Sequence, residues 1–151
     1  METVLAGEAY LPLFIISFLA ATLIPLGSEW LLASMVISGT SLPATVTVAS
    51  AGNYLGAVTT WLIGLFGGAF LIRRVLKIDE AKEEKAKRAY SQYGSWSLLL
   101  SWLPIVGDPL CLVGGMMRVG FARFTLFVLT GKLLRYSAVA WLAKTGEAFI
   151  N

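Results

Sequence analysis

The sequence predicts an all-α integral membrane protein, built as an inverted repeat of a re-entrant helical hairpin and a transmembrane helix. Three observations predict this fold class: the composition, an internal repeat, and short apolar arms around Pro/Gly turns. The 151 residues are 57% hydrophobic and 14% charged, with a mean hydropathy of +0.75. A soluble domain is about 45–50% apolar and about 25% charged. A chain this small has too little interior to hide so many apolar side chains from water, so we expect it to lie in a membrane.

The second observation is a repeat with a spacing of 79 residues along the chain. Pro25 corresponds to Pro104, and Glu29 corresponds to Asp108. Three further pairs match at the same spacing: Leu31 with Leu110, Gly52 with Gly131, and Gly67 with Gly146. Prolines and acids are scarce here, so a matched proline and acid favour a true repeat. We expect one membrane domain over residues 1–151, with repeat 1 at 10–72, a linker at 73–94 and repeat 2 at 95–146.

The third observation is that each repeat starts with two short apolar arms around a break. The first arm, Tyr10–Ile24, reaches ~22 Å at ~1.5 Å per residue, which is short of a ~30 Å hydrocarbon core. Non-helical backbone is tolerated there only where protein or water surrounds it, so we expect re-entrant hairpins. The alternative is two ordinary spans, with the acids at the interface and residues 30–37 as an exposed apolar loop. The predicted arms of the second hairpin are Trp96–Leu103 and Asp108–Met117. The predicted turn residues of the two hairpins are Pro25, Gly27, Pro104, Gly107 and Pro109.

A long helix is predicted after each hairpin. The first runs from Leu42 or Ala44 to Ile72, and the second runs from Phe121 to Lys144. The first carries two small-xxx-small pairs, Gly52 with Gly56 and Gly64 with Gly68, which suit close helix packing. If each repeat crosses the membrane once, the second repeat is inverted and the hairpins meet near the midplane, as in secondary transporters.

The linker holds most of the basic residues of a chain whose net charge is +3. We expect an amphipathic helix from Asp79 to Tyr93, because its acids come early and its bases come late, as the helix dipole prefers. Gly94 is the predicted stop. Basic segments beside membrane spans lie in the cytoplasm. We therefore expect residues 73–88 to be cytoplasmic, with both termini on the opposite face, and no nucleic-acid partner.

Glu29 and Asp108 are the candidates for proton coupling. Ionisable groups inside a membrane are costly and mark functional sites. A carboxyl group in a medium of low dielectric can load and release a proton at physiological pH. The alternative is that the two acids cap the second arm of each hairpin, and the two roles are compatible.

Lys132 and Arg135 lie three residues apart, on one face of the last predicted helix. A cation in mid-span needs an acid partner, an aqueous cavity or an anionic ligand. We expect these two residues and Arg118 to bind an anionic headgroup. The alternatives are an internal ion pair with Asp108 or Glu29, and, for Arg118, snorkelling to lipid phosphate. Asn53 is either a cavity contact or an interhelical hydrogen bond.

Several classes of site are excluded. The chain has no histidine and one cysteine, which rules out a His-based triad, the usual zinc sites and a disulfide framework. It carries no phosphate-binding loop, dinucleotide fingerprint or nucleophile elbow. We expect no catalytic residue, metal or cofactor, and an intramembrane enzyme acting on lipid is the least favoured alternative.

These motifs resemble the DedA family, also called the VTT or SNARE-associated domain. Residues 25–29 resemble its first hairpin, and residues 56–64 with Gly67 or Gly68 resemble its glycine-spaced helix. Residues 101–109, followed by 114–117 and Phe121 or Phe124, are similar to its second hairpin. The resemblance covers residues 10–145, and the chain length is most similar to the short YqaA-type members.

The resemblance implies two facing re-entrant hairpins, a bacterial inner-membrane location, and transport or scrambling of lipids that depends on the proton-motive force. Glu29 inherits the role of the family's intramembrane acid. Typical members carry arginines where this chain has Ser101 and Gly107, and we expect Lys132 and Arg135 to substitute for them. The expected substrate is an anionic lipid, with a phospholipid or undecaprenyl-phosphate-like headgroup. The alternative is a membrane scaffold or partner subunit for membrane homeostasis, with the glycine faces available for a homo-oligomer.

Overall fold

The computed structural model describes residues 2–22, 27–74, 80–103 and 106–150. Every regular element in these ranges is a helix, which confirms the predicted all-α class. In chain order they are α1 (Glu2–Ala20), α2 (Ser28–Ile37), α3 (Leu42–Arg74), α4 (Glu80–Tyr93), the 3₁₀ helix η1 (Gly94–Trp102), α5 (Gly107–Met116) and α6 (Phe121–Ile150).

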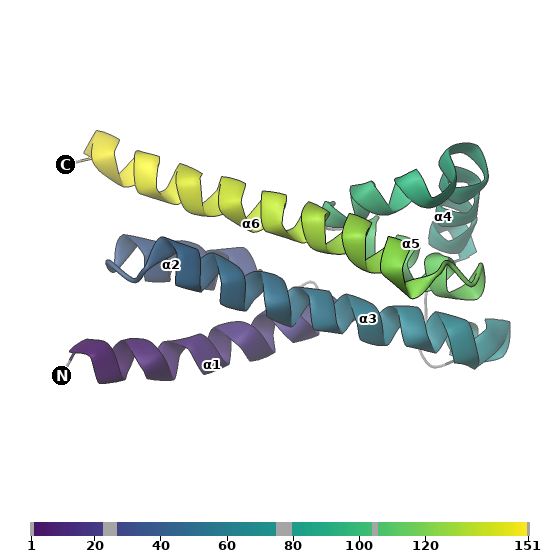
Figure 1. Cartoon of the computed structure of the whole chain (residues 1–151), viewed down its shortest axis with the longest axis horizontal. Helices are drawn as coiled ribbons and strands as arrows, with labels where there is room; N and C mark the ends of the chain where they lie inside the picture. Colours follow the sequence, from purple (N-terminus) through teal and green to yellow (C-terminus); the bar gives the residue numbers. More distant parts are fainter. Residues whose placement is uncertain (1, 23–26, 75–79, 104–105, 151) are drawn as a thin grey trace.

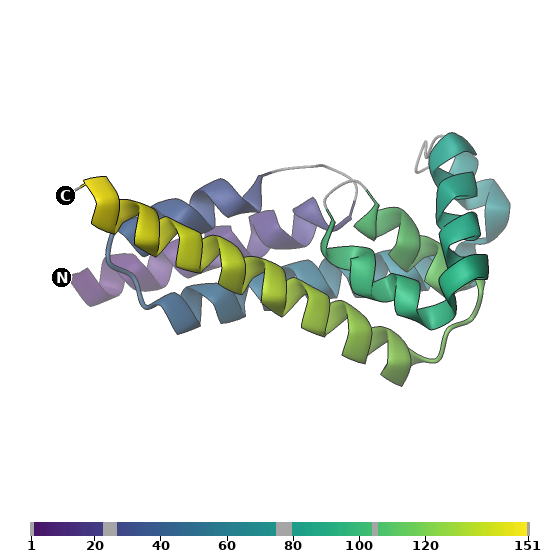
Figure 2. The ribbon, with the colours of Figure 1, turned by 90° about the horizontal axis from the view of Figure 1, so that it is seen from above.

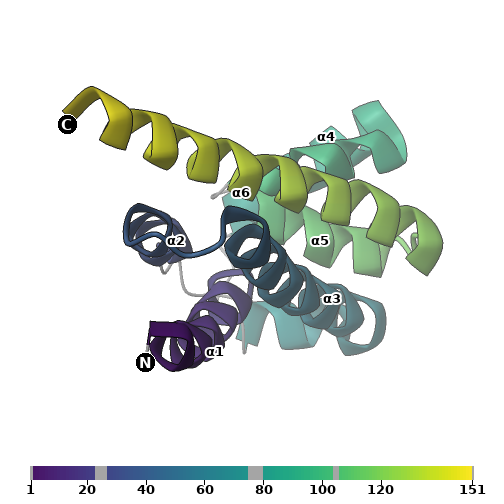
Figure 3. The same ribbon diagram turned by 60° about the vertical axis from the view of Figure 1, so that its left-hand side comes forward.

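The helices form an elongated bundle with both chain termini at one end and α4 at the other (Figure 1). α1 runs from the terminal end to the middle of the bundle, and α2 returns from there. η1 and α5 do the same from the α4 end (Figure 2). We call α1 with α2 the first hairpin and η1 with α5 the second hairpin. Both hairpins therefore reach the middle, whereas α3 and α6 run the length of the bundle (Figure 1). Figure 3 shows α6 along its length and α3 closer to end-on.

One helix in the described ranges is long and apolar enough to cross a membrane, the segment Phe121–Gly146 of α6. Only 28% of its apolar window is buried inside the protein, so most of this surface faces outward. α3 was predicted as a second crossing. It is longer, at 33 residues, but polar side chains such as Asn53 and Thr60 interrupt its apolar sequence. The arms Ala9–Ala20 and Ser28–Ile37 are apolar but short.

Two predicted arms differ from the observed helices. α1 begins at Glu2 instead of Tyr10, because the preceding residues are mostly good helix formers. The first arm of the second hairpin was expected at Trp96–Leu103, but it is a 3₁₀ helix that starts at Gly94. A 3₁₀ helix rises ~2.0 Å per residue against ~1.5 Å for an α-helix. The tighter winding therefore lets a short arm reach farther into the bundle.

The structure confirms the helix predicted for the linker. α4 covers Glu80–Tyr93, within one residue of the expected start and at the expected end. Gly94 follows it with a φ of +58°, the left-handed conformation that favours glycine at the end of a helix. This turn directs the chain from α4 into η1 and so aims the second hairpin at the middle of the bundle.

Glycines let α3 pack closely on one arm of each hairpin. A Cβ at Gly52 would lie 2.5 Å from the carbonyl oxygen of Phe14 in α1, and Gly56 faces α1 in the same way. Farther along α3, Gly64 lies against the backbone of α5, and Gly115 of α5 lies against the backbone of α3. Three of the four predicted packing glycines thus make close helix contacts. The side-chain environment of Gly68 lies outside the described residues.

We expect Gly64→Ala to destabilise the protein, because the new methyl group would overlap the Leu112 carbonyl oxygen and push α3 away from α5. Overpacking of this kind costs about 1–3 kcal/mol. Gly146→Ala is the control, since nothing lies within 4 Å of its Cβ position. Thermal unfolding in detergent measures both variants. Equal melting temperatures would contradict the close contact between α3 and α5.

Candidate functional site

The interior of the bundle consists of two apolar clusters with a polar layer between them. One cluster lies towards the α4 end, and its buried members include Ala57, Trp61, Leu98, Leu110, Phe124 and Val128. The other lies towards the termini, and its members include Leu13, Leu32, Val46, Ala49, Tyr136 and Ala140. Along α6, Lys132 falls between the residues of the two clusters, and Asn53 does so along α3. These two residues also correspond in the 79-residue repeat.

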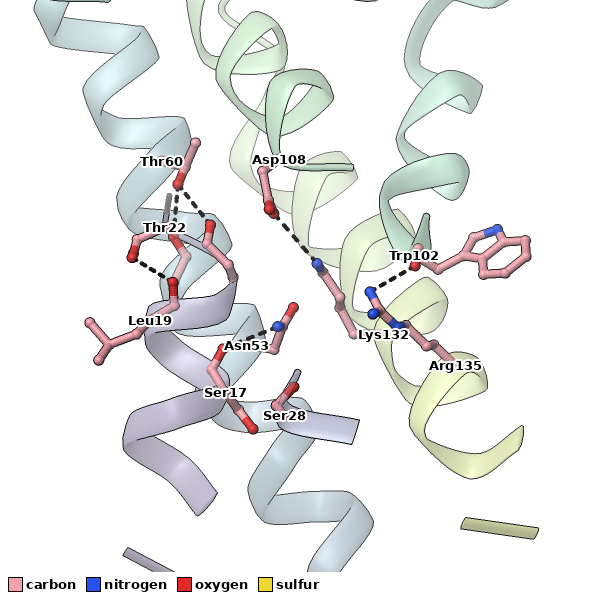
Figure 4. A network of polar contacts seen from close by, with 12 residues as sticks. Ser17, Leu19, Thr22, Ser28, Asn53, Thr60, Trp102, Asp108, Lys132 and Arg135 are labelled. Atoms are coloured by element: carbon pink, nitrogen blue, oxygen red, sulfur yellow. Dashed lines mark hydrogen bonds and ion pairs between the residues drawn. The ribbon is translucent and has the colours of Figure 1, made fainter. Parts of the chain in front are cut away.

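Arg135 joins the two hairpins at this level. Its Nη2 forms an ion pair with Oε1 of Glu29, in the first turn of α2. Its Nη1 donates a hydrogen bond of 2.9 Å to the carbonyl oxygen of Trp102, the last residue of η1 (Figure 4). A guanidinium group presents several donors in a fixed plane, so it can hold two acceptors at once. One side chain of α6 therefore ties the inner end of the first hairpin to that of the second.

Lys132 is the most deeply buried charged residue described, with 2% of its surface exposed. Its Nζ lies 3.9 Å from Oδ1 of Asp108, in the first turn of α5 (Figure 4). This separation is an ion pair but exceeds the ~3.2 Å of a good hydrogen bond. The pairing of Lys132 and Arg135 with the two acids agrees with one alternative drawn from the sequence. Both acids lie in the first turn of their helices, and the N-cap positions, held by Gly27 and Val106, carry no side-chain hydrogen bond.

A neutral polar cluster lies one helical turn from Lys132. The hydroxyl groups of Tyr136 and Ser28 are 2.7 Å apart, and Nδ2 of Asn53 donates to the carbonyl oxygen of Ser17 at 3.0 Å. Figure 4 shows Ser28 beside Ser17 and Asn53, so the two hydrogen-bonded pairs lie together. We call these four residues, from α1, α2, α3 and α6, the hydroxyl cluster. Sequence reasoning missed Ser17, Ser28 and Tyr136. The available signal was the position of Tyr136, four residues after Lys132 on the same helix face.

Part of this polar layer has unused hydrogen-bonding capacity. Among the described residues, the buried side-chain atoms without a partner are Ser17 Oγ, Ser50 Oγ, Asn53 Oδ1, Trp61 Nε1 and Ser101 Oγ. Buried polar groups are normally paired, so unpaired ones call for a ligand, water or a change of conformation. Asn53 therefore makes the interhelical hydrogen bond considered from the sequence, and its Oδ1 has no partner among the described residues.

The remaining predicted site residues are spread over the bundle. Arg118 is exposed in the turn before α6, and Lys132 lies about three helical turns beyond the start of that helix, so the structure does not bring Arg118 to the ion pairs. Gly107 is buried against the backbone of Ser101, which leaves no room for a side chain. Gly27 precedes α2 and Pro109 lies in the first turn of α5. Pro25 and Pro104 lie outside the described residues.

Comparison with known proteins gives a family and several relatives. Residues 24–144 match the VTT domain. The chain is 44% identical to the inner membrane protein YqaA of Escherichia coli K12 over 129 residues, which cover 85% of this chain and 86% of that protein. It is 35% identical to an uncharacterized protein of Haemophilus influenzae, over 87% of this chain and 85% of that protein. No solved structure matches the chain significantly.

A double-mutant cycle on Glu29→Gln and Arg135→Gln is expected to give a coupling free energy of about 1–3 kcal/mol, because contacting residues in one network are not additive. Their side chains are only 27% and 17% exposed. The control is the cycle on Glu84 and Arg88, an exposed i,i+4 pair whose coupling should be about 0.3–0.5 kcal/mol. Unfolding in detergent measures both cycles. Equal coupling energies would show that Arg135 does not hold the first hairpin.

Proposed function

Because the chain belongs to the VTT domain (DedA) family of membrane proteins, we propose that it is a lipid translocase of the bacterial inner membrane. In this proposal, Lys132 and Arg135 guide an anionic lipid headgroup through the middle of the bundle. Glu29 and Asp108 couple this movement to protons. Neither relative named above carries the name of an enzyme, and the proposed activity makes and breaks no covalent bond in the lipid.

We infer that both hairpins are re-entrant and that the two repeats have inverted topology. The ten residues of α2 and the ten of α5 each extend ~15 Å, and the apolar part of α1, Ala9–Ala20, extends ~18 Å, against a ~30 Å hydrocarbon core. Each arm therefore ends within the membrane, in contact with protein, as unpaired backbone requires. α3 and α6 are the crossings in this topology. The termini share one side of the membrane, and α4 lies on the other.

The observation that carries the function is the pairing of both hairpin acids with cations on one face of α6. A carboxylate and a phosphate compete for the same cation. Protonation of an acid removes its negative charge and leaves the cation free for a phosphate. Proton uptake and headgroup binding then favour one another, as thermodynamic linkage requires. The loaded site keeps the same net charge as the empty one, which limits the cost of moving charge through the membrane.

The scaffold alternative has less support. It relied on glycine faces that were free for a second subunit, but Gly52, Gly56 and Gly64 pack against α1 and α5 of the same chain. Destabilisation of the protein by Glu29→Gln with no specific loss of lipid movement would favour this alternative.

Impermeant thiol labelling of intact cells tests the topology. In a Cys111→Ala background, single cysteines replace Thr3, Ser41 and Ser91. Re-entrant hairpins predict that Thr3 and Ser41 label from one side and Ser91 from the other. Four ordinary spans predict instead that Thr3 and Ser91 share a side and Ser41 lies opposite.

Reconstitution in liposomes tests the function. With tail-labelled phosphatidic acid, the protein should move lipid between leaflets, at a rate that depends on a pH gradient. Because Lys132→Gln removes one charge-assisted contact, we expect it to lower the transport rate roughly tenfold. Lys144→Gln is the control, because Lys144 is exposed near the end of α6. The double variant Glu29→Gln with Asp108→Asn should abolish the pH dependence of the transport rate. A pH dependence that survives both changes would refute the coupling role of the acids.

A further inference from the structure

We propose that the hydroxyl cluster is a second subsite of the headgroup site and that it selects phosphate headgroups carrying free hydroxyl groups, such as glycerol phosphate. This inference rests on the proposed function, because it names the class of headgroup that the polar layer accepts. Its members are Ser17, Ser28, Asn53 and Tyr136. Each of these residues is at most 3% exposed, and each comes from a different helix.

The first argument is the chemistry of the unpaired atoms. Asn53 Oδ1 can only accept a hydrogen bond, whereas the hydroxyl of Ser17 can donate and accept. Neither atom has a partner in the described part of the chain. A phosphate oxygen can only accept, so it cannot pair with Asn53 Oδ1. An ammonium group can only donate, so it leaves the hydroxyl hydrogen of Ser17 without an acceptor. A hydroxyl group complements both atoms, because it donates and accepts at the same time.

The second argument is the position of the cluster relative to charge. Tyr136 lies four residues after Lys132, so its hydroxyl group and the Lys132 ammonium belong to one face of α6 and to adjacent turns. A turn of helix is ~5.4 Å long, which is the scale of the spacing between the phosphate and the outer hydroxyl groups of a glycerol phosphate. Lys132 and Arg135 also disfavour an ammonium headgroup at this level through like-charge repulsion. The site therefore fits phosphate at the cation and hydroxyl groups at the cluster.

The third argument concerns access. All four side chains are buried, so a headgroup reaches them only when the inner ends of the hairpins move apart. The Ser28–Tyr136 hydrogen bond, at 2.7 Å, links α2 to α6 directly beside the Glu29–Arg135 ion pair. A headgroup hydroxyl can replace Ser28 as the partner of Tyr136 when α2 shifts. The exchange keeps Tyr136 paired, and so avoids the cost of leaving a buried hydroxyl group unsatisfied.

Binding of water-soluble probes to the purified protein in detergent tests the subsite without any transport step. The probes are glycerol 3-phosphate and methyl phosphate, and the readout is a titration monitored by tryptophan fluorescence. One hydrogen bond corresponds to about fivefold in affinity, so the protein should prefer glycerol phosphate by about fivefold or more. Tyr136→Phe should reduce this preference by about fivefold and leave the affinity for methyl phosphate unchanged.

Tyr54→Phe is the matched control. Its hydroxyl group also bonds α3 to α6, through Thr125 Oγ1 at 2.7 Å, but it lies about three helical turns from Tyr136 along α6. This variant should keep the preference for glycerol phosphate. Ser17→Ala provides a second, smaller change in the cluster, in case Tyr136→Phe lowers the melting temperature. Equal affinity of the unmodified protein for the two probes, or an equal effect of Tyr136→Phe and Tyr54→Phe, would overturn the proposal.

A transport assay in liposomes distinguishes failure of this inference from failure of the proposed function. It also distinguishes a lipid headgroup from a free phosphate ester as the ligand. The lipids are tail-labelled phosphatidylglycerol, phosphatidic acid and phosphatidylethanolamine. Faster movement of phosphatidylglycerol, lost in Tyr136→Phe, supports the subsite on a lipid. Equal movement of the two anionic lipids overturns the hydroxyl selectivity and leaves lipid translocation standing. A preference for glycerol phosphate in the binding assay, with no movement of any lipid, supports the subsite for a soluble ester and refutes lipid translocation.

Discussion

The contacts of the Arg135 guanidinium group hold together two arms that arrive from opposite ends of the bundle. One arm contributes the Glu29 carboxylate and the other contributes the Trp102 carbonyl. Neither hairpin contains a basic partner for this carboxylate near its own inner end. Both hairpins therefore depend on α6 for the polar contacts at the point where they stop. In a hydrocarbon environment, unpaired groups at these ends would be costly, so the position of Arg135 determines where the hairpins meet.

The polar layer follows from the same constraint. Apolar clusters on either side support the helices, and the charged and hydroxyl side chains gather where the helical arms end. Arg135 uses two of its donor groups within the protein, whereas Lys132 has a single carboxylate at 3.9 Å. The two cations are therefore not equivalent. Arg135 is suited to holding the resting arrangement, and Lys132 is the better candidate for exchange between a carboxylate and a ligand.

Much of this arrangement could be predicted from the sequence, because the 79-residue repeat, the proline breaks and the isolated charges are local signals. The α4 boundaries and the stop at Gly94 followed from such signals, and the pairing of the acids with cations on α6 was one of the alternatives that the sequence left open. The 3₁₀ winding of η1 could not, since an apolar segment of nine residues fits either helix type. The hydroxyl cluster was also missed. Serine and tyrosine are ordinary in a membrane helix, and only the tertiary contacts of four separate helices bring Ser17, Ser28, Asn53 and Tyr136 together.

The sequence repeat divides the chain into a first and a second half, whereas the glycine contacts of α3 group helices from both halves. Close backbone packing joins α3 to α1 and to α5, one arm of each hairpin. The other arms, α2 and η1, contact α6 more than any other helix. The bundle thus consists of two interleaved bodies, each with helices from both halves of the sequence. The Glu29–Arg135 contact lies within one body, whereas Lys132–Asp108 bridges the two. A sliding motion between these bodies would strain both the Lys132–Asp108 pair and the Tyr54–Thr125 hydrogen bond, and it would leave the glycine contacts of α3 with α1 and α5 in place.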